Sequence, residues 1–154
     1  DMKDVLGVNV LGAFLCAREA IKRMKFRKDV NTNTDNNGRG GHGGRIINVG
    51  SISSMSPRPN SIAYTTSKFA LQGLTKSLSL DCRVHGIAVG IIHPGNVISD
   101  LLSPEDVEVR GRTEGFISPD DVAKCVLTMA SLPYTCNILE LTVMPTNQPF
   151  IGRG

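Results

Sequence analysis

The chain has 154 residues, of which 40% are hydrophobic and 20% are charged, and its formal net charge is +3. This length and hydrophobic content suffice for one globular domain with a core and exclude a wholly disordered chain. The small, dispersed positive charge and the scarcity of aromatic residues argue against nucleic-acid binding. No apolar run is long enough to span a membrane, and the first residues lack the layout of a signal peptide, so we expect no membrane association.

The four cysteines show no paired C-x-x-C spacing; they are Cys16, Cys82, Cys125 and Cys136. A zinc site and a disulfide framework are therefore both weak interpretations, and we expect no metal site. Unpaired cysteines of this kind fit a reducing compartment best. We accordingly expect a cytoplasmic protein.

The first half of the chain predicts two helices on either side of a strand. Residues 1–26 carry apolar side chains at helical spacing, which indicates a helix with one buried stripe. The Asn- and Gly-rich stretch 27–44 predicts a flexible surface loop. Residues 45–50, RIINVG, form a short run without alternation, which is typical of a strand covered on both faces. Apolar residues then recur at helical spacing over residues 61–83, and Gly86 ends this second helix.

The second half continues the alternation. Residues 87–92, IAVGII, predict a second buried strand, which is closed by a Pro-Gly loop over residues 93–96. Residues 100–117 are mixed and charged, which indicates a substrate lid or another surface excursion. Residues 118–131 begin with a capping serine followed by proline, which are start signals of a third helix. Residues 137–144, NILELTVM, predict the third strand.

This order of helices and strands predicts parallel strands joined by right-handed crossovers, and hence an open α/β sheet. In such sheets ligands bind beyond the carboxyl ends of the strands. The segments 50–54, GSISS, and 93–99, HPGNVIS, both fall at that edge.

Three polar residues near this edge suggest proton chemistry. Ser51 leaves the first strand, Tyr64 enters the next helix thirteen residues later, and Lys68 follows one helical turn further on the same face. A phenol is mostly protonated at neutral pH and can donate a proton, while the Lys68 ammonium is placed to favour the phenolate. Ser51 would hydrogen-bond the substrate oxygen whose charge changes during hydride transfer.

Each of these residues also has a purely structural interpretation. On helix statistics alone, Tyr64 and Lys68 are an exposed pair, and Ser51 at a strand end is an ordinary turn residue. Asn9 is disfavoured by propensity in the middle of a helix and could simply face water. Turn chemistry explains the Pro-Gly loop with or without a ligand, and His93 before it is expected to be extended and packed.

Several segments together resemble the short-chain dehydrogenase/reductase family. They are Y-T-T-S-K with a serine thirteen residues before the tyrosine, N-V-L-G-A-F upstream, and H-P-G-N-V-I-S downstream, and they cover nearly the whole chain. The resemblance implies a Rossmann-like, doubly wound parallel sheet. It also implies an NAD(P)-dependent oxidoreductase that transfers a hydride between the cofactor and a carbonyl or secondary alcohol substrate, with Tyr64 as general acid/base.

The resemblance also implies roles for individual residues. Asn9 would complete a catalytic tetrad with Ser51, Tyr64 and Lys68 by holding a water that connects Lys68 to solvent, and Lys68 would also hold the nicotinamide ribose. The residues that would bind the cofactor are Tyr64, Lys68, Pro94, Gly95, Val97 and Ser99. The ending L-E-L-x-x-x-P is similar to that of members which lack the family's commoner Gly-Gly tail. Some relatives of that kind oxidise 3-hydroxy acids with NADP, so the resemblance slightly favours NADP over NAD. The family's habit of association implies a homo-oligomer formed through the helices at 1–26 and 61–83.

The chain departs from the family in one respect. The Gly-rich turn T-G-x-x-x-G-x-G, which binds the cofactor phosphates, occurs nowhere in it, and neither does the family's N-A-G segment. The glycines of residues 38–44 precede a strand, whereas a phosphate turn follows one and opens a helix. Residues 1–154 therefore resemble a single partial domain, the C-terminal part of a longer enzyme.

Three hypotheses follow. We favour an NAD(P)-dependent oxidoreductase, of which this chain is the catalytic and substrate-facing portion. The first alternative is a truncated, catalytically inactive fragment that acts as an assembly or regulatory partner. The second is a non-enzymatic α/β domain that binds a ligand, which the intact serine, tyrosine and lysine argue against.

Overall fold

The structure is a computed structural model that describes residues 1–25, 43–100 and 102–151. The loop predicted for residues 27–44 lies outside the described residues, apart from Gly43 and Gly44. No helix within the described part of the chain combines the length and the hydropathy needed to cross a membrane.

Three parallel strands form one sheet in the order β1 (Gly44–Val49), β2 (Ile87–Pro94) and β3 (Glu140–Val143). Strand β2 lies in the middle and is buried along nearly its whole length, as its continuous apolar run predicted. The α/β class and the parallel sheet are thereby confirmed.

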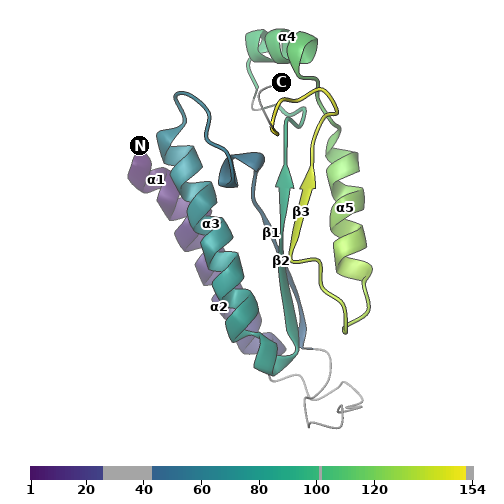
Figure 1. The fold of residues 1–154 in the computed structure, drawn as a ribbon. Coiled ribbons are helices and arrows are strands. Elements are labelled where there is room, and N and C mark those ends of the chain that lie inside the picture. The colour runs from purple at the N-terminus through teal and green to yellow at the C-terminus, as the bar shows by residue number, and fades with distance from the viewer. Residues whose placement is uncertain (26–42, 101, 152–154) are drawn as a thin grey trace.

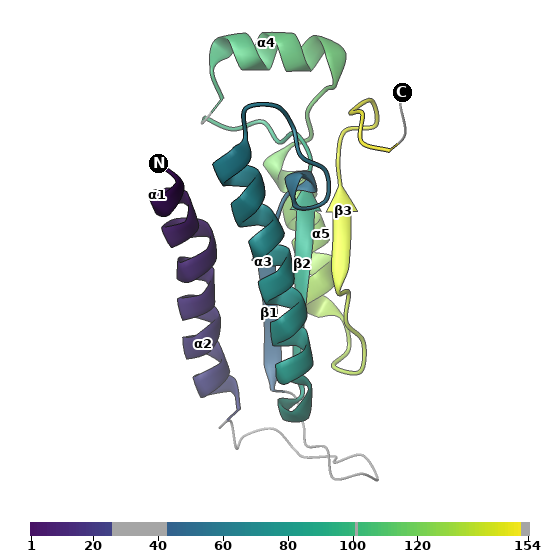
Figure 2. The same cartoon turned by 60° about the vertical axis from the view of Figure 1, so that its left-hand side comes forward.

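Helices cover both faces of this sheet (Figure 1). The first helix comprises α1 (Met2–Leu6), a π-helical turn η1 (Gly7–Gly12) and α2 (Ala13–Met24). It lies beside α3 (Ile62–Asp81) on one face, as Figure 2 shows, while α5 (Pro119–Ser131) covers the other face. The three predicted helices are thus confirmed, and the π-helical turn was not predicted.

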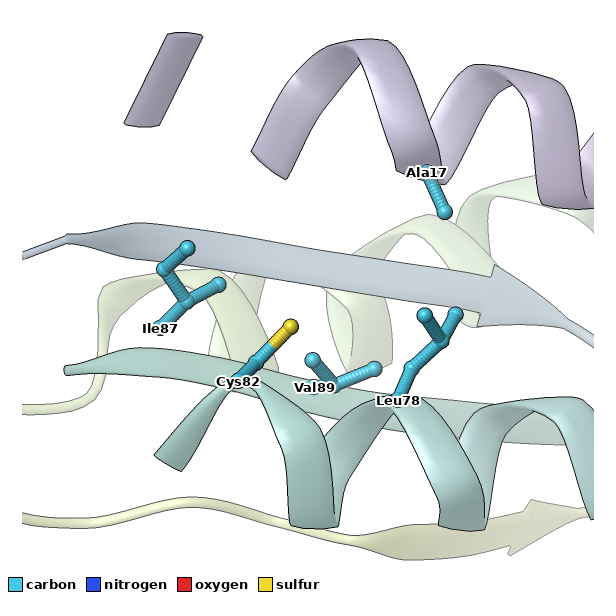
Figure 3. Close-up of a cluster of buried hydrophobic side chains, with 5 residues drawn as sticks. All are labelled: Ala17, Leu78, Cys82, Ile87 and Val89. Atoms are coloured by element: carbon cyan, nitrogen blue, oxygen red, sulfur yellow. The ribbon is translucent and has the colours of Figure 1, made fainter. Parts of the chain in front are cut away.

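The hydrophobic core joins α2, α3 and β2. Its buried members, drawn in Figure 3, are Ala17, Leu78, Cys82, Ile87 and Val89. Burying each of the larger aliphatic side chains stabilises the fold by roughly 1.5–3 kcal/mol. This packing holds α3, and with it Tyr64 and Lys68, at a fixed position on the sheet.

The edge strands differ from the prediction. We expected residues 45–50 to be covered on both faces, and α2 and α5 do contact β1 from opposite faces of the sheet (Figure 1). The strand is nevertheless only half-buried, Val49 is 55% exposed, and β1 pairs with β2 alone among the described strands. Strand β3 is shorter than the predicted 137–144. The side-chain amide of Asn137 donates to the carbonyl of Val89 over 2.8 Å, at a point where strand pairing was expected.

Strand β2 is longer than predicted. The Pro-Gly sequence was expected to end it after Ile92, but His93 and Pro94 still pair with Thr142 and Val143. A proline is tolerated here because it is the last residue of the strand. The next amide, that of Gly95, donates to the carbonyl of Val143 over 2.8 Å.

The segment 100–117, predicted as a surface excursion, contains the helix α4 (Pro104–Thr113) beyond the carboxyl ends of the strands (Figure 1). This helix was not predicted, although Pro104 followed by Glu105 is a helix start signal. The next helix, α5, begins at the predicted capping serine: the Ser118 hydroxyl accepts from the backbone amide of Asp121 over 3.1 Å, and the Asp121 side chain completes a capping box.

Candidate active site

The turn that follows β1 presents Ser51. Ser51 caps a short 3₁₀ turn, η2 (Ile52–Ser54), and its buried hydroxyl oxygen accepts the amide of Ser53 over 3.1 Å. The hydroxyl hydrogen is therefore available for another acceptor. Gly50 precedes it because a Cβ there would lie 2.6 Å from His93 Nδ1, so a larger residue would force the turn away from β2.

His93 supports this turn from behind. Its ring is fully buried, and Nδ1 lies 3.0 Å from the carbonyl oxygen of Ser51. Since a carbonyl only accepts, Nδ1 carries the hydrogen. Burial lowers the pKa of His93, which keeps the ring neutral. The expectation that His93 is extended and packed is confirmed.

Tyr64 and Lys68 lie on successive turns of α3 and face the same cleft. The Lys68 ammonium nitrogen lies 5.5 Å from the centroid of the Tyr64 ring and donates to the carbonyl of Val49 over 3.0 Å. This bond ties α3 to the end of β1. Burial lowers the pKa of Lys68, so the ammonium is held in surroundings that favour it less than water does.

Asn9 lies in the π-helical turn η1 and not in a regular α-helix, where its low helix propensity would disfavour it. Its side-chain amide donates to Ser67 Oγ over 2.9 Å, and the Ser67 hydroxyl donates to the Tyr64 carbonyl over 2.7 Å. Such turns are frequent at functional sites. The amide thus reaches the neighbour of Lys68 in the chain and braces the turn that carries Tyr64.

A cleft with a volume of about 710 Å³ opens beyond the carboxyl ends of the strands. Most of the residues predicted for the site line it, namely Ser51, Tyr64, Lys68, Pro94, Gly95 and Val97. Asn9 and Ser99 do not, and Ser99 is exposed to solvent. The cleft therefore brings together residues from two βα connections, as expected for an open α/β sheet.

Other cleft residues were not identified from the sequence; among them are Arg58, Arg110, Glu114, Phe116, Gln148 and Phe150. One Glu114 carboxylate oxygen accepts from Asn96 Nδ2 over 2.6 Å and from Gln148 Nε2 over 3.4 Å. Gln148 Oε1 in turn accepts a hydrogen bond from the backbone N–H of Asn96 over 2.9 Å. This polar cluster of Asn96, Glu114 and Gln148 joins the Pro-Gly loop, the end of α4 and the C-terminal segment. Of these three residues, only Asn96 lies in a segment that the sequence placed at the site, directly after Pro94 and Gly95.

The residues present fit the nicotinamide and ribose portion of a dinucleotide. The cleft combines the phenol of Tyr64, the hydroxyl of Ser51 and the ammonium of Lys68 with the apolar side chains of Pro94 and Val97. The ribose hydroxyls and the carboxamide on the flat nicotinamide ring are groups that such a lining can bind. The volume of the cleft also lies within the usual range for small-molecule sites. The sequence motif T-G-x-x-x-G-x-G, which binds the pyrophosphate in the family, does not occur in the chain.

Comparisons with known proteins agree with this geometry. A family model described as short chain dehydrogenase matches residues 1–108. The chain is 31% identical over 140 residues to the short-chain dehydrogenase fogB of Aspergillus ruber, which covers 85% of this chain and 51% of fogB.

Solved structures show the same fold. The acetoin dehydrogenase YohF from Salmonella typhimurium superposes with a TM-score of 0.73 and 28% identity, covering 93% of this chain and 53% of that one. A closed form of serine dehydrogenase complexed with NADP⁺ superposes with a TM-score of 0.62 and 26% identity, covering 72% of this chain and 48% of that one. The chain spans about half the length of these proteins.

Proposed function

Because the chain belongs to the short-chain dehydrogenase family, we propose that it carries the catalytic part of an NAD(P)-dependent oxidoreductase acting on a carbonyl or secondary alcohol substrate. One observation carries the proposal. Ser51, from the turn after β1, and Tyr64 and Lys68, from α3, line one cleft at the carboxyl edge of the sheet. The cofactor, when bound, supplies or accepts the hydride.

Tyr64 acts as the general acid/base. In the reductive direction its hydroxyl gives a proton to the substrate oxygen, and in the oxidative direction the phenolate takes that proton back. The Ser51 hydroxyl donates to the same oxygen. The Ser53 amide, which donates to Ser51 Oγ, holds the hydroxyl in place for this role. The bond from His93 to the Ser51 carbonyl keeps this turn in place.

Lys68 stabilises the negative charge that Tyr64 acquires when it gives up its proton. Its ammonium lies beside the Tyr64 ring in partly buried surroundings, where a charge interaction is stronger than in water. The same ammonium would hold the ribose hydroxyls of the cofactor. Asn9 would support proton exchange between Lys68 and solvent through a water, and its bond to Ser67 holds it at this helix.

The cofactor would place its nicotinamide against the Pro-Gly loop, near Pro94, Gly95 and Val97, with Ser99 following in the chain. The complex of serine dehydrogenase with NADP⁺ supports a nicotinamide cofactor for this fold. We propose NADP slightly ahead of NAD. Parallel assays with both cofactors test this preference.

Replacement of the phenol tests the mechanism. In the native protein, we expect Tyr64→Phe to lower kcat by about 10²–10⁴-fold, the usual contribution of a positioned proton donor. Cofactor affinity should stay within a few fold, because the phenol acts on the proton. Tyr134→Phe, in the exposed connection before β3, is the matched control. Comparable activity of the Tyr64→Phe protein and the parent would contradict the mechanism.

A further inference from the structure

Arg58 stands at the cleft next to the reacting group. Its guanidinium carbon lies 5.9 Å from the centroid of the Tyr64 ring, and its side chain belongs to the cleft lining. Lys68 approaches the same ring at 5.5 Å, but it is tied to the Val49 carbonyl. Arg58, unlike Lys68, is exposed to solvent. The guanidinium of Arg58 is therefore a cation that a molecule entering the cleft can reach directly.

The backbone around Arg58 is held in one conformation. Prolines on both sides, Pro57 and Pro59, restrict its backbone angles. The Ser61 hydroxyl donates to the Arg58 carbonyl over 2.8 Å. Asn60 has a φ of 57°, which only a few residue types adopt easily. This short connection between η2 and α3 thus presents the arginine to the cleft at a defined place.

The acidic side chain of the cleft is occupied elsewhere. The Glu114 carboxylate accepts hydrogen bonds from the side-chain amides of Asn96 and Gln148. Among the ion pairs of the described residues, none involves Arg58. Its recorded side-chain contact is with the face of the Tyr64 ring. The guanidinium fork therefore keeps its donors for a ligand.

We infer that Arg58 recognises a carboxylate on the substrate, so that the enzyme acts on small hydroxy acids and the corresponding oxo acids. This inference rests on the proposed oxidoreductase function. A planar guanidinium matches a carboxylate with two parallel hydrogen bonds. Since the guanidinium lies so near the Tyr64 ring, a short carbon chain must join the carboxylate to the reacting carbon.

The reaction balances with the proposed cofactor alone. In the oxidative direction the hydroxyl-bearing carbon loses a hydride to the oxidised nicotinamide, and the hydroxyl oxygen loses its proton to Tyr64. The products are an oxo acid, the reduced nicotinamide and a proton released to solvent. The carboxylate takes no part in bond changes and serves only to position the molecule.

Steady-state oxidation by the native protein tests this assignment. The substrates are lactate with lactamide and β-hydroxybutyrate with its primary amide, each pair differing in charge but hardly in shape. We expect kcat/KM for at least one acid to exceed that for its amide by about tenfold or more. In Arg58→Gln this ratio should fall to about one, and in Arg58→Lys it should be intermediate, because the charge remains without the fork.

Arg83→Gln is the matched control, because Arg83 lies in η3 (Arg83–His85) after the far end of α3 and is exposed. It should keep the preference for the acid. Equal kcat/KM values for acids and amides in the parent, or a preference that survives Arg58→Gln, would overturn the inference while leaving the oxidoreductase function standing. Failure of the native protein to oxidise acids, amides and uncharged secondary alcohols with either cofactor would count against both.

Discussion

At Lys68 the demands of catalysis and of stability oppose each other. Burial lowers the pKa of this ammonium, so the unfolded chain binds more protons than the folded chain between the two pKa values. The free energy of unfolding therefore rises with pH through that window, which ends near the free value of about 10.4. Below this window the cost of holding the buried charge is fully present.

We accordingly expect Lys68→Met to be inactive but no less stable than the parent at pH 7. Its advantage should shrink as the pH rises toward about 10, because the lysine of the folded parent gives up its proton below the free value of about 10.4. Denaturant titrations at both pH values measure this, with the exposed Lys3→Met as control. A variant less stable than the parent by the same amount at both pH values would show that the bond to the Val49 carbonyl outweighs the cost of burial.

His93 gives a second pH effect. Burial lowers its pKa, so below about pH 6.5 the unfolded chain takes up a proton that the folded chain does not. The free energy of unfolding must then decrease as the pH falls through this range. In His93→Asn, which can still donate to the Ser51 carbonyl, we expect a shallower decrease between pH 7 and pH 5. His85→Asn, at an exposed position, should keep the slope of the parent, and an unchanged slope in both variants would refute this role for His93.

At the scale of the elements, the polar cluster of Asn96, Glu114 and Gln148 holds three segments around the cleft. We expect Glu114→Ala to lower the free energy of unfolding by about 1–2 kcal/mol, because the side-chain amide of the nearly buried Asn96 loses its charged acceptor. KM should rise more than kcat falls, since the variant loosens the wall of the cleft and spares Tyr64.

Chemical denaturation and steady-state kinetics measure these effects. Glu108→Ala on the same helix is the control, because the ion pair of Glu108 with Arg112 is exposed and should contribute less than about 1 kcal/mol. Equal losses of stability in the two variants would argue that the cluster is an ordinary surface contact.

The elements predicted from the sequence are those whose signals are local. Helical spacing and a capping box located α3 and α5, and a continuous apolar run located β2. Helix α4 was missed because it carries few apolar residues, with Val107 and Val109 its main ones, so no apolar stripe marks it. Its placement depends instead on tertiary bonds, such as that between Glu114 and Asn96.

The candidate site divides in the same way. Ser51, Tyr64 and Lys68 were predicted together because their spacing along a strand end and a helix face is visible in the sequence. Gln148 reaches the same cleft from a distant part of the chain, and only folding brings it there. Arg58 lies between Ser51 and Tyr64 in the sequence, but its spacing follows no pattern that marks a cleft residue. Their roles could not be inferred from their neighbours in the sequence.

At the scale of the whole molecule, apolar side chains remain exposed on the first helix. Val8 is 74% exposed and Leu11 55%, and strand β1 leaves one edge without a partner strand among the described residues. Exposed apolar patches and free strand edges both favour association. We therefore expect residues 1–154 produced alone to form oligomers or aggregates through the first helix, made of α1, η1 and α2, and through α3.

Light scattering combined with denaturation measures this association. Leu11→Lys should reduce it, whereas Leu127→Lys, at a position 67% exposed on α5, should not. A monodisperse monomer that unfolds cooperatively would show that residues 1–154 fold as a self-sufficient domain.

The π-helical turn η1 determines in which direction about the helix axis the preceding side chains point. Each residue of an α-helix turns by about 100° about the axis, and the wider turn accommodates one residue more than a regular turn would. Deleting a single residue from Gly7–Gly12 would restore regular geometry and rotate the preceding residues by that angle relative to α2. The side chain that now meets Ser67 would then point elsewhere, although the composition of the helix had barely changed. In this helix, length is therefore as much a part of the site as residue identity.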